Sequence, residues 1–252
     1  MHSVTKAILL CGGAGLRLRN VSGDAPKAMA NVAGRPFLEL LLRQLRRHGF
    51  RRVILAVGYR QDVIHSHFGD RAFDLAIEYS PESSPLGTGG ALPNAADLVE
   101  SDVVLIMNGD SYTGVDLCRF ASDFREAKAD VSIVVVSNDE RSDCGLVSVD
   151  QNWNVLRFSE KQQFSLCSQY VNAGIYMVTR RILRDITPGV RISLEEELLP
   201  QWLAEGKSVR AFHFSGQCVD IGTPERFLRA QDLLANVETA PSVPEDDGKY
   251  SG

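Results

Sequence analysis

Strand-length apolar runs alternate with longer amphipathic stretches over the first half of the chain. The runs cover residues 7–10, 53–57, 75–79, 103–107 and 131–136. Their largely continuous apolar character predicts strands that are buried on both faces of a sheet. Between them, the spacing of apolar positions predicts helices over 36–48, 61–68, 89–98 and 117–128. This alternation predicts an α/β, Rossmann-like fold: a doubly wound, mainly parallel mixed sheet flanked by helices.

The pattern changes after about residue 137. Further strands are predicted over 146–149, 155–158, 170–178 and 208–214, and helices over 179–186, 193–204 and 224–234. We interpret this half as an extension of the same sheet, which gives a single domain over 1–237 with a first part at 1–136 and a second part at 137–237. Residues 238–252 are rich in Pro, Ser, Gly, Asp and Glu, a composition that is typical of a disordered tail.

Charge and cysteine content narrow the class of protein. The net charge of −5 argues against general affinity for nucleic acid or an anionic membrane. There are five cysteines and no CxxC pair, which favours a reducing compartment, and Cys11 has no evident histidine partner, so a packing role is expected for it. We find no signal-peptide pattern and no apolar run of roughly 18 residues. These features predict a cytoplasmic protein.

Positive charge is concentrated at the start of the chain. Residues 1–52 contain ten Lys or Arg and two Asp or Glu. The excess suits a region that binds polyphosphate, whereas Arg43, Arg46, Arg47, Arg51 and Arg52 are better explained as residues that solvate a helix and its exit.

A glycine-rich loop follows the first predicted strand. Residues 10–18 read Leu-Cys-Gly-Gly-Ala-Gly-Leu-Arg-Leu, and Pro26-Lys27 comes shortly afterwards. Glycines after a buried strand let backbone N–H groups approach phosphate oxygens without obstruction by side chains. Arg17 adds a planar cation that can hold a phosphate at two points, and Lys27 adds a mobile point charge. The segment therefore predicts a polyphosphate site.

Two common phosphate-binding patterns do not fit this loop. A Rossmann G-x-G-x-x-G that starts at Gly13 continues with Gly15 but meets Leu18 where the third glycine should stand. A Walker A loop requires Gly-Lys-Ser or Gly-Lys-Thr, which the sequence lacks. A nicotinamide-dependent oxidoreductase is accordingly disfavoured.

Asp110 stands where a ligand of the sheet is expected, and Asp220 lies just before a predicted helix start. Asp110 follows the strand predicted at 103–107, and ligands of open α/β sheets gather at the carboxyl ends of strands. Asp220 precedes Thr223 and Pro224, which suit a helix start. Hard cations such as Mg²⁺ prefer carboxylate oxygens and bridge them to phosphates. The alternative is that Asp110 caps the next element and Asp220 is a turn residue.

Six motifs in order resemble the sugar-1-phosphate nucleotidyltransferases. They are 12–18 with Pro26-Lys27 and Gly34-Arg35-Pro36, then 86–91, Asn108-Gly109-Asp110, Glu160-Lys161, Asn172–Tyr176 and Asp220–Pro224. The resemblance covers nearly the whole chain except the tail. Within the family the chain is most similar to the D-glycero-D-manno-heptose 1-phosphate guanylyltransferases.

The resemblance implies roles for the first part of the chain. The family binds a nucleoside triphosphate on the glycine loop, with Arg17 on the β and γ phosphates and Lys27 near the reacting centre. It also implies that Asp110 and Asp220 hold Mg²⁺ and that residues 86–91 read the base and ribose. The nucleotide-binding set that it implies is Leu10, Cys11, Gly12, Gly13, Ala14, Gly15, Gly87, Thr88, Gly89 and Asn108.

The second part is expected to bind the sugar. The resemblance implies that Glu160 takes sugar hydroxyls and that Lys161 takes the sugar phosphate, although Gln162 stands where the family usually has proline. Without the resemblance, Glu160 and Lys161 would be read as a solvated strand end. Gly145, Asn172 and Glu195 are the remaining sugar-binding candidates, and Gly174 and Tyr176 are alternatively structural.

The implied reaction is a direct in-line displacement that needs no general base, since the attacking phosphate is already ionised. The sugar 1-phosphate attacks the α-phosphorus of the triphosphate and pyrophosphate leaves, with Arg17, Lys27, Asp110 and Lys161 as the catalytic set. GTP with D-glycero-α-D-manno-heptose 1-phosphate is the preferred pair. UTP with N-acetylmuramic acid 1-phosphate, GTP with mannose 1-phosphate and dTTP with glucose 1-phosphate are alternatives, as is a non-catalytic sugar-nucleotide sensor. The family also makes a homodimer plausible.

Overall fold

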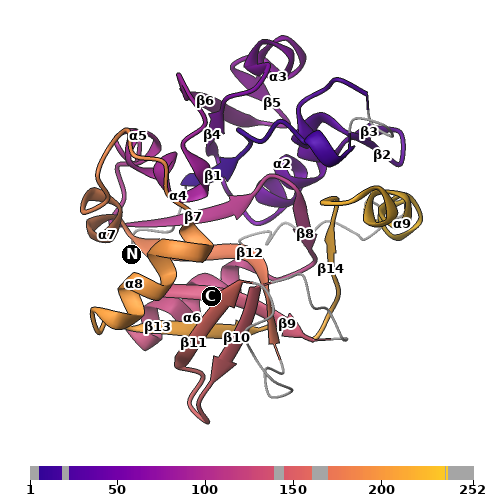
Figure 1. Cartoon of the computed structure of the whole chain (residues 1–252). Coiled ribbons are helices and arrows are strands. Elements are labelled where there is room, and N and C mark those ends of the chain that lie inside the picture. The colour runs from indigo at the N-terminus through magenta and orange to yellow at the C-terminus, as the bar shows by residue number, and fades with distance from the viewer. Residues whose placement is uncertain (1–5, 19–22, 139–144, 161–169, 236, 238–252) are drawn as a thin grey trace, which may run out of the picture.

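A computed structural model describes residues 6–18, 23–138, 145–160, 170–235 and 237, without the side chains of Ser159 and Glu160. Ten strands form the main sheet, in the order β11-β10-β12-β7-β1-β4-β6-β5, and β9 pairs with both β12 and β13 (Figure 1). Their bounds are β1 Lys6–Leu10, β4 Arg52–Val57, β5 Arg71–Ala72, β6 Leu75–Pro81, β7 Val103–Asn108, β9 Val131–Ser137, β10 Gly145–Val149, β11 Val155–Glu160, β12 Tyr170–Thr179 and β13 Val209–His213.

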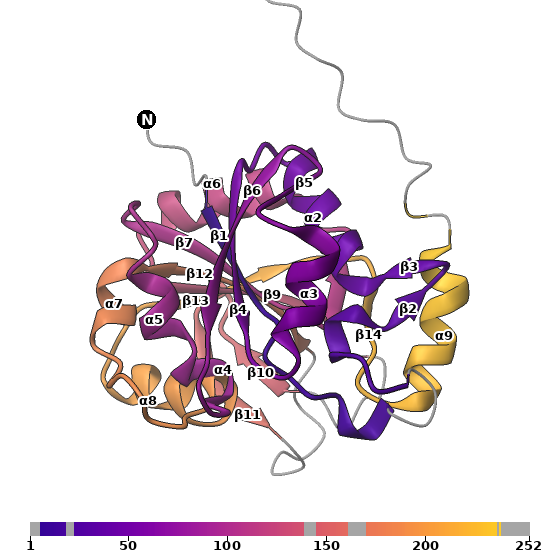
Figure 2. The same ribbon diagram turned by 90° about the horizontal axis from the view of Figure 1, so that it is seen from above.

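Helices cover both faces of this sheet (Figure 2). They are α2 Phe37–Arg47, α3 Gln61–Phe68, α4 Gly87–Gly90, α5 Leu92–Ala96, α6 Leu117–Ala127, α7 Arg180–Arg184, α8 Leu199–Ala204 and α9 Pro224–Leu234. Two 3-10 turns, η1 Leu16–Leu18 and η2 Lys27–Met29, and a π-helical segment, η3 Leu194–Leu198, complete the helical elements of the described residues. The predicted doubly wound α/β fold is confirmed.

Strand direction differs between the two halves of the sheet. β1 is parallel to β4 and β7, and β4 is parallel to β6, so their carboxyl ends meet at one edge. β12 then runs antiparallel to β7, with Ile175 opposite Met107, and joins the second half of the chain to this sheet. The antiparallel pairs β10–β11 and β10–β12 extend that second half past the carboxyl end of β7.

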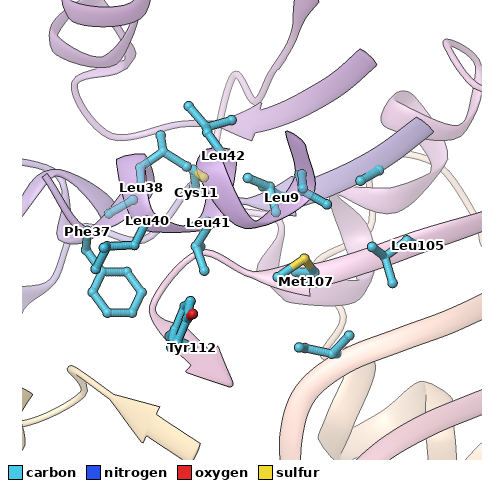
Figure 3. Packing of buried hydrophobic residues seen from close by; sticks show 14 of the residues in the cluster. Leu9, Cys11, Phe37, Leu38, Leu40, Leu41, Leu42, Leu105, Met107 and Tyr112 are labelled. Atoms are coloured by element: carbon cyan, nitrogen blue, oxygen red, sulfur yellow. The ribbon is translucent and has the colours of Figure 1, made fainter. Parts of the chain in front are cut away.

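The side chains of each central strand point alternately into two hydrophobic cores, one on each face of the sheet. In β1, Leu9 faces the core under α2, whereas Ile8 faces the core under α5 and α8. Figure 3 shows Leu38, Leu41 and Leu42 of α2 in the same cluster as Leu9 and Met107. A strand buried on both faces gains from apolar contact at every position, which explains the unbroken apolar runs in the sequence.

Helix α2 follows the expected pattern of start and end. Pro36 precedes its first residue, and Gly49 ends it with a φ of +81°, a conformation that glycine adopts without steric cost. Arg43 pairs with Glu39 at 2.9 Å, and Arg46 lies 3.4 Å from Asp74, so the polar face of the helix is occupied by surface ion pairs.

Two predicted helices are each divided in the structure. The stretch predicted as one helix over 89–98 is α4 followed by α5, because two glycines and Pro93 weaken continuous winding. The stretch predicted over 193–204 begins as η3, in which Leu198 N–H bonds the carbonyl of Ser193 at 3.0 Å. Pro200 has no N–H for the carbonyl of Glu196, and a wider turn accommodates this loss.

Two short strand pairs gave no signal in the sequence. β2 Asn31–Val32 pairs with β3 Arg35–Pro36, and β8 Ser111–Thr113 pairs with β14 Cys218–Asp220. Figure 1 shows β8 and β14 side by side next to α9. The second pair brings Asp220 beside Ser111, the residue that follows Asp110. No helix in the described ranges is long and apolar enough to cross a lipid bilayer.

Candidate active site

A cavity of about 670 Å³ opens at the edge where the carboxyl ends of β1, β4 and β7 meet. This is the position at which open α/β sheets bind ligands. It is lined by Leu10, Cys11, Gly12, Gly13, Ala14, Leu16, Lys27, Ala28, Gly58, Tyr59, Glu82, Ser83, Ser84, Pro85, Gly87, Thr88, Ala91, Asn108, Gly109, Asp110 and Arg191. Most of the residues expected to bind nucleotide are therefore brought together, and the arginines at 43, 46, 47, 51 and 52 are not among the lining residues.

The glycine loop forms one wall of the cavity. It leaves β1 with Cys11 N–H bonded to the carbonyl of Ala56 at 2.8 Å, and the carbonyl of Gly13 accepts the N–H of Lys27 at 3.3 Å. Gly15 has a φ of +60°, and a Cβ there would lie 3.0 Å from Cβ of Lys27. The close approach of Lys27 thus depends on glycine at this position.

Arg17 lies at the rim of the site. It belongs to η1, is exposed, and is not among the residues that line the cavity, whereas its neighbour Leu16 is. The role of Arg17 on phosphate therefore remains a prediction.

Cys11 is a packing residue in this structure. Its side chain is buried, and burial, with a smaller contribution from Asp110, raises the pKa of the thiol far above its ordinary value. Since the thiolate is the reactive form, Cys11 is a poor nucleophile.

Two carboxylates and two cations lie close together beside the cavity, which Lys27 and Asp110 line but Asp220 and Arg226 do not. Lys27 Nζ contacts Asp110 Oδ2, and Arg226 Nη1 donates to Asp220 Oδ1 at 3.0 Å. The N–H of Ile221 donates to the carbonyl of Asp110 at 3.0 Å, so the two aspartates sit on directly bonded segments. No group of three His, Cys, Asp or Glu suited to a metal occurs in the described part of the chain. Two carboxylates nevertheless suit Mg²⁺, which completes its shell with water and substrate phosphates.

Helix α4 is held against the segment that precedes η3. The carbonyl of Ile192 accepts the N–H groups of Gly89 and Gly90 at 3.0 and 3.1 Å, and Ile192 N–H donates to the carbonyl of Leu86. A Cβ on Gly90 would lie 2.3 Å from the carbonyl oxygen of Val190. Gly87, Gly89 and Gly90 therefore permit close packing here. This packing requires glycine independently of the expected contact with the nucleotide.

Glu195 is the centre of a buried hydrogen-bond network. Its carboxylate accepts the hydroxyl of Thr88 at 2.5 Å, Asn108 Nδ2 at 3.2 Å and the hydroxyl of Tyr176 at 3.0 Å. Only 7% of Glu195 is exposed, and it does not line the cavity. Glu195 therefore positions Thr88 and Asn108, and its direct contact with the sugar stays a prediction.

The remaining sugar-binding candidates lie beyond the carboxyl end of β7. Asn172 Nδ2 donates to the hydroxyl of Tyr176 at 2.7 Å, and Gly145 pairs with Glu160 across the β10–β11 hairpin. Leu146 pairs with Val171, so Gly145 and Asn172 are close neighbours. The structure brings these backbones together but places neither residue in the cavity wall. The side chain of Glu160, all of Lys161 and the tail at 238–252 lie outside what the structure describes.

Sequence reasoning missed several polar residues of this region, among them Tyr59, Glu82, Arg191 and Arg226. Glu82 follows β6, and its N–H donates to the carbonyl of Val57 while its Oε2 accepts Leu86 N–H at 2.9 Å. Burial raises the pKa of the Glu82 carboxyl, and the Leu86 N–H partly opposes this effect. An acid placed directly after a strand that ends at the ligand edge was the signal that could have found it.

The chain matches the nucleotidyl transferase family over residues 6–237. It therefore belongs to the nucleotidyl transferase family, which confirms the resemblance described above and the expectation that the protein is an enzyme.

Individual relatives are similar over most of the chain. The mannose-1-phosphate guanylyltransferase of Mycobacterium tuberculosis is 36% identical over 94% of this chain and 67% of its own length. The D-glycero-alpha-D-manno-heptose 1-phosphate guanylyltransferase of Campylobacter jejuni is 35% identical over 88% of this chain and 96% of its own length. Among solved structures, HddC from Yersinia pseudotuberculosis complexed with GMP-PN is 31% identical, with a TM-score of 0.79 over 91% of this chain and 99% of that chain.

Proposed function

We propose that the protein transfers a guanylyl group from GTP to D-glycero-α-D-manno-heptose 1-phosphate and releases pyrophosphate. The product is GDP-heptose, a donor for surface polysaccharide synthesis. Guanylyl transfer is supported by relatives in Mycobacterium and Campylobacter and by a structural neighbour complexed with GMP-PN.

The position of Glu82 is the main structural support for guanine as the base. Glu82 lines the cavity, its Oε2 is bonded to Leu86, and its Oε1 would lie 2.8 Å from a Cβ on Gly12 in the phosphate loop. A carboxylate is an acceptor with two oxygens, and guanine presents two adjacent donors, N1–H and N2–H₂. Uracil and thymine present one N–H between two carbonyl oxygens, which a carboxylate repels. Glu82 therefore favours guanine among the common bases.

The sugar is assigned through similarity. Two heptose 1-phosphate guanylyltransferases, at 35% and 33% identity, support the heptose. Mannose 1-phosphate is the second candidate, because a mannose-1-phosphate guanylyltransferase is 36% identical. Both sugars share the manno configuration, so the discrimination must come from contacts to the additional carbon of the heptose.

The chemistry consists of positioning and charge neutralisation. Lys27 lies at the cavity wall beside Asp110, where it can hold the phosphates of both substrates against their mutual repulsion. Arg17 closes on the departing pyrophosphate from the rim. Asp110 and Asp220 would hold Mg²⁺, which supplies charge neutralisation at the phosphate oxygens. Lys161 is proposed to hold the sugar phosphate, with Glu160, Gly145 and Asn172 on the sugar side.

The setting follows from the substrates. We place the reaction in the cytoplasm, where nucleoside triphosphates are made and the free cysteines Cys11, Cys118 and Cys218 stay reduced. A homodimer is proposed from the family resemblance, and light scattering of the purified chain tests it.

Pyrophosphate release tests the proposal directly. The purified protein is incubated with Mg²⁺, each of the four ribonucleoside triphosphates and dTTP, and a panel of sugar 1-phosphates that includes heptose, mannose, glucose and N-acetylmuramic acid. We expect release with GTP and the heptose, with mannose 1-phosphate slower. Release with a different pair replaces the substrates and keeps the reaction. No release with any pair, from protein that still binds GDP-heptose, contradicts catalysis and indicates a sensor.

A further inference from the structure

Arg226 makes an ion pair with one of the two proposed metal ligands. It stands in the first turn of α9, where Thr223 accepts its backbone N–H, and its Nη1 lies 3.0 Å from Asp220 Oδ1. The side chains are 24% and 14% exposed, respectively, so solvent screens this pair less than it would an ion pair on the open surface. Arg226 therefore holds the Asp220 carboxylate firmly in the absence of substrates.

Lys27 of η2 and Arg226 of α9 both reach the space next to Gly222. A Cβ on Gly222 would lie 3.0 Å from Asp220 Oδ1, 3.7 Å from Lys27 Nζ and 3.8 Å from Arg226 Nη1. Lys27 also contacts Asp110 Oδ2. The two carboxylates and two cations thus form one compact cluster whose formal charges cancel.

In the absence of nucleotide, binding of a divalent ion to this cluster is electrostatically unfavourable. The ion must share carboxylates that already hold a guanidinium and an ammonium, and it must lie close to both of these cations. A triphosphate changes this balance, because its oxygens are strong partners for guanidinium and ammonium groups. The metal and the nucleotide are therefore expected to stabilise each other's binding.

We propose that Arg226 competes with the divalent metal for Asp220, so that the metal binds tightly only together with the nucleoside triphosphate. This rests on the proposed function, since it takes Asp220 as a metal ligand. Arg226 acts through Asp220 and is a positioning residue. An arginine with a merely structural role at the start of α9 would leave metal affinity unchanged when replaced, or would lower it.

Manganese binding measured by electron paramagnetic resonance tests this competition without turnover. Mn²⁺ is titrated into the full chain in the absence of nucleotide, and the wild type is compared with Arg226→Gln. We expect Arg226→Gln to bind Mn²⁺ more tightly, by on the order of tenfold, because Asp220 loses a charge-assisted partner. The gain is expected to disappear in Arg226→Gln/Asp220→Asn, and Arg226→Lys should stay close to the wild type.

Two further variants separate the possible causes of a change. Arg229→Gln removes an exposed charge from the same helix and should leave Mn²⁺ affinity unchanged. Arg226→Met keeps the aliphatic stem and replaces Arg226→Gln if that variant does not fold. Equal or weaker Mn²⁺ binding by Arg226→Gln, or by Arg226→Met where it is used instead, overturns the competition, and so does binding too weak to detect.

The same titration distinguishes this failure from failure of the metal site. With GTP present, the single substitutions Asp110→Asn and Asp220→Asn in the otherwise wild-type chain should each weaken Mn²⁺ binding. If both leave it unchanged, the proposed metal site is wrong. If both weaken it while Arg226→Gln has no effect, the metal site stands and only the role of Arg226 is rejected.

Discussion

The hydroxyl of Tyr176 donates a 3.0 Å hydrogen bond to the carboxylate of Glu195, a contact between the long strand β12 and the π-helical segment η3. The same carboxylate accepts a hydrogen bond from the hydroxyl of Thr88, which lines the cavity. The hydroxyl of Tyr176 in turn accepts a hydrogen bond from Nδ2 of Asn172, a sugar-binding candidate. A single buried carboxylate therefore connects the wall of the cavity to the strand that carries a sugar-binding candidate.

Replacing Glu195 by Ala is expected to impair both stability and catalysis. The change leaves the Tyr176 hydroxyl and the Asn108 amide without this acceptor, and an unsatisfied buried polar group costs about 1–3 kcal/mol. Thermal unfolding and kcat/KM measure the two effects. Glu196→Ala is the matched control, because Glu196 is the exposed neighbour on the same turn. Equal melting temperatures and equal kcat/KM in both variants would show that the network is dispensable.

Glu82→Gln is expected to reduce the preference for GTP over UTP by on the order of tenfold, since one good base contact contributes about 1–3 kcal/mol of discrimination. Glutamine supplies one acceptor in place of two, and its amide group can donate to a carbonyl of uracil. The ratio of kcat/KM for GTP and UTP is the measurement. An unchanged ratio would mean that another part of the cavity reads the base.

The raised pKa of Glu82 gives this contact a pH dependence. The carboxylate that accepts both donors of guanine exists above the pKa, and it is lost as the pH falls through it. KM for GTP should therefore rise on acidification, beginning at a higher pH than for a solvent-exposed carboxyl. The Gln variant should lack this rise, and its persistence there would assign the titration to a different group.

Local signals in the sequence account for the elements that were predicted well. The helix over 224–234 has a capping Thr223 and a proline in its first turn, and the structure gives α9 the same bounds. β8 and β14 have three residues each, too few for a hydrophobic period, so the strand pair that brings Asp220 to Asp110 could not be predicted. The contacts of Glu195 and Arg226 join residues far apart in the sequence, and only the folded chain shows them.

Asp110→Ala is expected to abolish turnover while the fold is retained. Asp110 lines the cavity and is 31% exposed, so its loss creates no apolar void, although Lys27 loses its carboxylate partner. The expected fall in kcat is on the order of 10³-fold or more, comparable to the loss of a principal electrostatic contact in other enzymes. Circular dichroism checks the fold and pyrophosphate release checks turnover. Activity near the wild-type level would refute the assignment of Asp110 to the metal.

Gly90→Ala tests the packing of α4 on the segment before η3. The added Cβ would lie 2.3 Å from the carbonyl oxygen of Val190, a backbone atom that cannot rotate away. Overpacking of this kind costs about 1–3 kcal/mol, and it pushes α4 away from residues that also hold Leu86 and Thr88 in place. We expect a lower melting temperature together with a higher KM for GTP.

Gly13→Ala is the matched control for this prediction. A Cβ on Gly13 meets no atom within 4 Å, so its stability should stay near that of the wild type. Because Gly13 lines the cavity, its methyl group should still hinder the approach of phosphate and raise KM. The two variants therefore separate two uses of glycine. Gly90 permits the close packing of two backbones, and Gly13 leaves open the space that is proposed for the nucleotide. A stable Gly90→Ala protein with unchanged KM would show that the segment before η3 moves aside freely, and that its contact with α4 does not shape the cavity.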